Sequence, residues 1–118
     1  MSVGFSSQAE KRFLEILSRY PKKDAALLPL LWLAQDEFGA LSKEVSAYVA
    51  EKVGVSLGRV ESVVSFYTLY STKPGGKHDV QICRNISCRL RGADDLMKYM
   101  ERDLNVAPGD TTADGNFT

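Results

Sequence analysis

The stretch His78–Leu96, "HDVQICRNISCRLRGADDL", decides how the second half of the chain is interpreted. Its first residues alternate between polar and apolar, which predicts a short strand over Asp79–Cys83. Cys83 ends this strand, and Cys88 comes just before a helical pattern. A C-x4-C pair at a strand-to-helix turn can present two thiolates to one metal centre, and iron–sulfur centres select thiolate ligands. The spacing therefore indicates a metal site, although spacing alone is a weak signal.

The surroundings of the two cysteines decide between two interpretations. One is a pair of buried free thiols, since free cysteine is among the most buried residue types. The other is metal binding, which three features favour. Gly92 allows a close approach of the backbone, Asn85 and Ser87 can help a tight loop turn its amides toward sulfur, and nearby positive charge favours thiolates and an anionic cluster. The basic residues are Arg84, Arg89 and Arg91.

Other metal and catalytic chemistries find less support in the chain. Two thiolates do not complete an iron–sulfur cluster, which usually takes four protein ligands. His78 is the only histidine, so a two-histidine Rieske centre is excluded. A three-ligand zinc site from His78 and the two cysteines is arithmetically possible but has no recognised spacing. No hydrolytic constellation is visible, and we predict no catalytic residue.

The first part of the chain predicts four helices. Ser7 followed by Glu10 has the spacing of a capping box that opens the first helix. Pro29 should lie in the first turn of the second helix, where its missing N–H costs little, and Gly39 should end that helix. Trp32 is expected to be a large core or interface residue. Ser42 should begin the third helix and Gly54 should end it. Ser56 should begin the fourth helix.

The sequence texture changes after Tyr70. The segment "STKPGGK" over 71–77 has turn chemistry and predicts a boundary. A second helical pattern, Ala93–Leu104, follows the cysteines, and Asn116–Thr118 resembles the beginning of another strand. We therefore expect an α+β fold, with a helical module over 1–72 and the start of a β-α-β unit over 73–118. The second helix should bury Leu96, Met97, Met100 and Leu104.

Composition limits the function classes. The 118 residues include 15 basic and 15 acidic side chains, so no overall field favours nucleic acid or an anionic membrane surface. The longest apolar run, 25–34, is about half the roughly 20 residues that a membrane span requires. Without a recognisable signal peptide, two cysteines favour a reducing compartment.

Several segments together resemble one known family. The segments "LLPLLWLAQDEFGALS" (27–42), "VESVVSFY" (60–67), "CRNISCRLRGADDL" (83–96) and "GDTTADGNFT" (109–118) match its apolar helix, its V-x-x-V-x-S-F-Y motif, its first cluster loop and its G-x-T-x-D-G-x-F-T motif. The family is the thioredoxin-like [2Fe-2S] ferredoxin subunit of NADH:quinone oxidoreductase, respiratory complex I, with relatives in NAD-linked hydrogenases and formate dehydrogenases. The resemblance covers the chain from about the first helix to the last residue.

The resemblance implies a fold and a set of ligands. The fold would be a four-helix module followed by an incomplete thioredoxin-like β-α-β ferredoxin domain. In the family, C-x4-C and a later C-x3-C pair hold one [2Fe-2S] cluster, so Cys83 and Cys88 would be the first two ligands. The second pair is missing here, and we expect a chain truncated before it. Residues that would lie beside the cluster are Arg84, Asn85, Ser87 and Gly92.

The resemblance also implies partners and a location. The cluster would exchange electrons with a flavoprotein subunit that binds FMN and NAD, in a cytoplasmic complex peripheral to the inner membrane, with no nucleic-acid partner. The helical module would dock this subunit through Phe66, Tyr67 and Tyr70. The alternative function is a cofactor-free helical adaptor or assembly module with structural cysteines.

Overall fold

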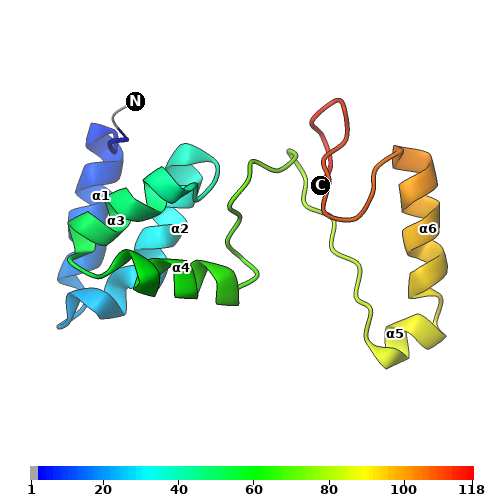
Figure 1. Cartoon of the computed structure of the whole chain (residues 1–118), viewed down its shortest axis with the longest axis horizontal. Coiled ribbons are helices and arrows are strands. Elements are labelled where there is room, and N and C mark those ends of the chain that lie inside the picture. Colours follow the sequence, from blue (N-terminus) through cyan, green and yellow to red (C-terminus); the bar gives the residue numbers. More distant parts are fainter. Residues whose placement is uncertain (1–2) are drawn as a thin grey trace. The chain divides into compact units, whose positions relative to one another are not determined.

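The computed structural model describes residues 3–118 and divides into two compact units, Met1–Pro74 and Gly75–Thr118. The helices of the first unit are α1 (Ser7–Ser18), η1 (Lys23–Ala26), α2 (Leu27–Phe38), α3 (Lys43–Val53) and α4 (Leu57–Phe66) (Figure 1). Those of the second unit are α5 (Ile86–Leu90) and α6 (Ala93–Leu104). No helix within residues 3–118 is both long enough and apolar enough to cross a membrane.

Serine side chains begin three of the helices in the first unit. Ser42 and Ser56 cap α3 and α4, as the sequence predicts, each accepting a hydrogen bond from a backbone N–H in the first turn. The predicted capping box at Ser7 is wrong, because Ser6 is the residue with extended backbone and its side chain accepts from the Ala9 N–H. The Glu10 carboxylate binds Lys52 instead of closing a capping box.

The predicted ends of α2 and α3 are confirmed. Gly39 and Gly54 follow these helices with φ of 79° and 80°, a left-handed conformation that costs glycine little. Pro29 is the third residue of α2, within its first turn. The 3-10 turn η1 directly before α2 was not expected from the sequence.

One hydrophobic core holds the first unit together. Its largest fully buried side chains come from α2, α3, α4 and the loop after α2. Trp32 is not part of it, since this side chain is 53% exposed. These largest fully buried side chains are Leu30, Leu31, Leu41, Val49, Val53 and Val60.

A lysine fixes the N-terminal segment to this core. The Lys52 ammonium binds the Glu10 carboxylate and lies 4.7 Å from the ring centroid of Phe13 and 5.5 Å from that of Phe5. Burial by itself lowers the pKa of Lys52, but the hydrogen bond to Glu10 and the nearby Tyr48 outweigh it, so the pKa is raised. The charged form of Lys52 therefore connects α1 and α3.

The second unit contains much less regular pairing than predicted. Residues 79–83 form no regular strand; within the described chain, an isolated parallel bridge joins His78 to Phe117. The Val80 N–H donates to the Thr118 carbonyl at 2.8 Å, and the Thr118 N–H donates to the His78 carbonyl at 3.0 Å. The segment has only this short partner, which is too few residues for a ladder. The described residues are therefore predominantly helical, and the strand content of the α+β prediction is limited to this bridge.

Gly76 makes this close pairing possible. A Cβ atom at Gly76 would lie 2.6 Å from the Phe117 carbonyl carbon. No side chain fits there without moving backbone, so the glycine is required by close approach.

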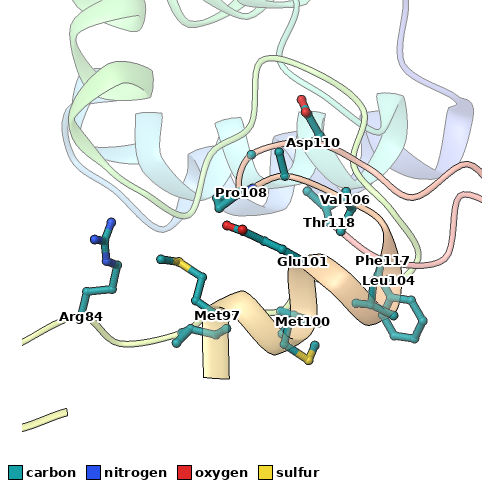
Figure 2. Close-up of a pocket in the computed structure, with 14 residues that line it drawn as sticks. Arg84, Met97, Met100, Glu101, Leu104, Val106, Pro108, Asp110, Phe117 and Thr118 are labelled. Atoms are coloured by element: carbon teal, nitrogen blue, oxygen red, sulfur yellow. The ribbon is translucent and has the colours of Figure 1, made fainter. Parts of the chain in front are cut away.

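Helix α6 has the predicted bounds but not the predicted burial. Ala93 is its only buried residue, and Leu96 is 50% exposed. The expectation that α6 buries Leu96, Met97, Met100 and Leu104 is therefore wrong. Met97, Met100 and Leu104 are only half-buried, because they line an open groove of about 240 Å³ (Figure 2), and the exposed Leu96 is not part of that groove.

Candidate functional site

The two cysteines lie on either side of a sharp turn into α5. Cys83 follows the paired segment, Asn85 caps α5 with its side chain, and Cys88 lies inside this single-turn helix. The short helix brings the second thiol back toward the first. Cys83 is exposed and Cys88 is half-buried, so the interpretation as two buried free thiols is wrong.

Hydrogen bonds make the two thiols unequal. The pKa of Cys83 is lowered, first by the Asn85 backbone N–H and then by the hydrogen bond with Cys88. The pKa of Cys88 is raised, first by its hydrogen bond with Cys83, which favours the protonated Cys88 thiol, and then by the negative charge on the Cys83 sulfur. Cys83 is therefore the first of the pair to ionise, and a thiolate is the form that binds metal.

Both cysteines line one open pocket of about 380 Å³. Its walls come from the segment before Cys83, from α5 and from the start of α6. It differs from the apolar groove of Figure 2, which contains no cysteine. The remaining lining residues are Gln81, Ile82, Arg91, Gly92, Ala93 and Leu96.

The arginines of the loop share an acidic partner that sequence reasoning missed. The Arg89 Nε donates to Asp94 Oδ2 at 3.0 Å, and the Arg84 Nε lies 3.8 Å from Asp94 Oδ1. Arg91 is exposed and makes no ion pair in the described part of the chain. The only sequence signal for Asp94 was a carboxylate in the first turn of a helix that follows basic residues.

The other predicted site residues occupy distinct places. The backbone N–H of Asn85 lowers the pKa of Cys83. Ser87 is exposed in α5, and its carbonyl accepts from the Arg91 N–H. Gly92 has a φ of 101° and joins α5 to α6, so here it is required by its left-handed backbone. Nothing in the chain approaches its missing Cβ within 4 Å.

His78 does not join the cysteines. Its ring packs against Phe117 at a centroid distance of 5.6 Å. Within residues 3–118, no group of three or more histidine, cysteine or acidic side chains is arranged to hold a metal ion. The described residues thus form a two-thiol site rather than a three-ligand zinc site.

Comparison with known proteins places the chain in a family. The family of thioredoxin-like [2Fe-2S] ferredoxins matches residues 13–118. The chain belongs to this family. The match begins within α1 and includes the rest of the helical unit, the cysteine loop and the paired segment that follows α6.

Relatives from several bacteria are similar over most of the chain. It is 41% identical over 101 residues to an NADH-quinone oxidoreductase subunit of Rhizobium meliloti, covering 86% of this chain and 60% of that protein. It is 36% identical over 118 residues to an NADH-quinone oxidoreductase subunit of Thermus thermophilus, covering 98% and 65%. An NADP-reducing hydrogenase subunit of Solidesulfovibrio fructosivorans is 34% identical over 108 residues, covering 92% and 63%. The chain therefore spans about three fifths of the length of these relatives.

The donor set fits one half of the family's cluster. A [2Fe-2S] cluster takes four thiolates, and Cys83 and Cys88, which lie next to each other at a common pocket, would supply two of them.

Proposed function

We propose that the protein is an electron-transfer subunit of an NADH dehydrogenase of the complex I type. The observation that carries the proposal is that the exposed Cys83 and the half-buried Cys88 lie next to each other at one pocket, in a chain of the [2Fe-2S] ferredoxin family. A bound cluster would supply one-electron chemistry between two-electron flavin chemistry and later carriers. The names of the relatives support an NADH- or NADP-linked oxidoreductase.

The residues of this chain would hold and shield the cluster. Cys83 and Cys88 would bind one iron as thiolates. Asn85 would donate its backbone N–H to sulfur, and Ser87 would support the turn of α5. Gly92 would let the backbone pass close to the cluster, and Arg84 would contribute positive charge.

The experiment is iron and sulfide analysis of the protein purified as its gene encodes it. We expect iron and acid-labile sulfide in equal amounts and a rhombic EPR signal on reduction, both lost in Cys83→Ser and Cys88→Ser. Ser7→Ala, at an exposed serine of the first unit that lies away from the cysteine pocket, is the control and should keep the signal. Since the 118 residues provide two of four thiolates, we expect these residues alone to hold no stable cluster. Absence of iron from the gene product would refute the proposal.

We propose that the partner is a flavoprotein subunit that binds FMN and NAD, and that the helical unit docks it. Phe66 at the end of α4 is 77% exposed, and Tyr67 packs edge-on against it. Exposed aromatic anchors concentrate binding energy. Tyr70 is 8% exposed and donates to the Leu28 carbonyl at 2.8 Å, so it supports this surface from inside and is not an anchor.

Co-purification with the flavoprotein subunit tests the docking surface. Phe66→Ala should weaken the complex at least tenfold. Leu14→Ala, an exposed apolar residue on α1, is the control and should bind like the wild type. Equal binding by both variants would mean that docking uses another surface.

We also propose that 1–72 is a four-helix docking module and that 73–118 is the β-α-β beginning of a thioredoxin-like domain. The apolar groove beside α6 supports this, because further strands on 79–83 would cover Met97, Met100 and Leu104. The complex would be cytoplasmic and peripheral to the inner membrane. The exposure of Cys83 disfavours the alternative, an adaptor with structural cysteines.

A further inference from the structure

Two arginines from opposite ends of the cysteine loop converge on one carboxylate. Arg84 directly follows Cys83, and Arg89 directly follows Cys88. Both direct their Nε atoms to Asp94, at 3.8 Å and 3.0 Å. A single side chain on α6 therefore contacts the chain next to each thiol.

The position and contacts of Asp94 allow it to restrain the cysteine loop. Its Oδ2 accepts from Arg89, whereas Oδ1 is buried from solvent and has no hydrogen-bond partner. The residue lies in the first turn of α6, where a carboxylate interacts favourably with the helix dipole. The turn at Gly92 is what allows Arg89 and Asp94, five residues apart, to meet.

Stability does not explain this arrangement. The arginine side chains are more than half exposed, and exposed ion pairs contribute little to the free energy of unfolding. What the pairs do determine is where two positive charges lie relative to the thiols. Charge and hydrogen bonding around a cluster set its reduction potential.

We propose that Asp94 is the positioning residue of the cysteine loop. It holds Arg84 and Arg89 against α6, fixes the loop that carries both thiols, and offsets part of the positive charge beside the cluster. This inference rests on the proposed function for the cluster, but the restraint on the loop exists without it.

The test compares Asp94→Asn with Asp95→Asn. Asp95 is the neighbouring carboxylate of α6, exposed and without an ion pair in the described residues, so both variants lose one negative charge. The first readout is NMR of the arginine Nε–H groups and amide exchange at Arg91 and Gly92, which donate within the loop. It is made on the 118-residue chain. The second is the midpoint potential of the cluster in the gene product, followed by EPR.

The expected result is specific to Asp94→Asn. The Arg89 Nε–H should lose its protection and the loop amides should exchange faster, while Asp95→Asn resembles the wild type. The midpoint potential should move upward, and further than in Asp95→Asn, because less negative charge stabilises the reduced cluster. Unchanged arginine signals would overturn the inference whether or not a cluster binds. A midpoint potential that shifts equally in both variants would also overturn the inference. A gene product without iron would refute the proposed function, and the NMR result alone would then test whether Asp94 restrains the loop.

Discussion

The two units of the chain differ in how their apolar side chains are used. In the first unit, apolar residues from Phe13 to Tyr70 form one continuous buried cluster. In the second unit, the buried residues among those described are Ala93 and Thr112. The candidate ligands Cys83 and Cys88 both belong to this second, open unit. Stability and chemistry are thus assigned to different parts of the chain, which is common where a site must admit a cofactor.

The difference arises from what each helix packs against. Helix α2 contacts both α1 and α3, so its leucines are covered from two sides. Helix α6 packs against the single-turn helix α5, and its other apolar side lines the groove. An amphipathic helix gains its stability from such packing rather than from propensity.

The largest predicted effect is a difference in hydrogen exchange between the units. Amides in α2 and α3 should open only by unfolding of the core, whereas those of α6 should open locally at small cost. We expect at least about a thousandfold greater protection in α2 than in α6, corresponding to about 4 kcal/mol. Exchange measured by mass spectrometry or NMR on the 118-residue chain gives both values in one sample. Equal protection in the two units would mean that the second unit acquires a cover in solution, from another copy or another pairing.

The sequence was sufficient to predict the helices whose signals are local. Ser42, Gly54 and Ser56 begin or end helices by interactions with their own backbone neighbours, so their roles follow from residue type and spacing. The bounds of α6 could be predicted from its local sequence pattern. The family could also be predicted, because its motifs are short segments of contiguous sequence.

Features that depend on distant contacts could not be predicted. The strand at 79–83 depends on a partner, and only a short one is present at Phe117 and Thr118. The pairing of Arg89 with Asp94 depends on the turn at Gly92, which helical spacing rules do not include. Trp32 has a large apolar side chain of the kind that is usually found in a core. Its exposure depends on which face of α2 the other helices cover, and local sequence does not reveal that.

Replacing one leucine in each unit by alanine compares how much each unit contributes to stability. Leu31 is fully buried in α2, and Leu31→Ala should lower the free energy of unfolding by ~2–5 kcal/mol through lost burial and a cavity. Leu96 on α6 is half exposed, and Leu96→Ala should cost under ~1 kcal/mol. Urea unfolding followed by circular dichroism measures both changes. A comparable loss in the two variants would contradict the assignment of stability to the first unit.

Tyr70 gives the first unit a smaller, pH-dependent contribution. Burial raises the pKa of Tyr70 to about 12, above the ordinary value near 10. The stabilisation is therefore complete below pH 10 and is lost as the pH rises toward 12. Tyr70→Phe should lower the free energy of unfolding at pH 7 by ~1 kcal/mol, because the Leu28 carbonyl loses its donor. It should also flatten the decline above pH 10.

Unfolding curves of the wild type and Tyr70→Phe between pH 7 and 11.5 measure both effects. Tyr20→Phe is the control, since this partly exposed residue makes no side-chain hydrogen bond in the described chain, and it should change the stability at pH 7 by less than ~0.5 kcal/mol. A decline above pH 10 that is equally steep in Tyr70→Phe would exclude Tyr70 as its source.

The smallest effect separates two glycines, one in each unit. Gly58 is in the first turn of α4, and a Cβ atom added there would meet nothing within 4 Å. Gly58→Ala should therefore raise the free energy of unfolding of the first unit by ~0.5 kcal/mol.

Gly76→Ala places a methyl carbon 2.6 Å from the Phe117 backbone and must separate the paired segments. Because that pairing stabilises only the second unit, global unfolding should barely change, while the amides of His78, Val80 and Thr118 lose protection in NMR exchange. A cooperative loss of stability across the whole chain in Gly76→Ala would show that the two units unfold together, so that neither could be assigned a stability of its own.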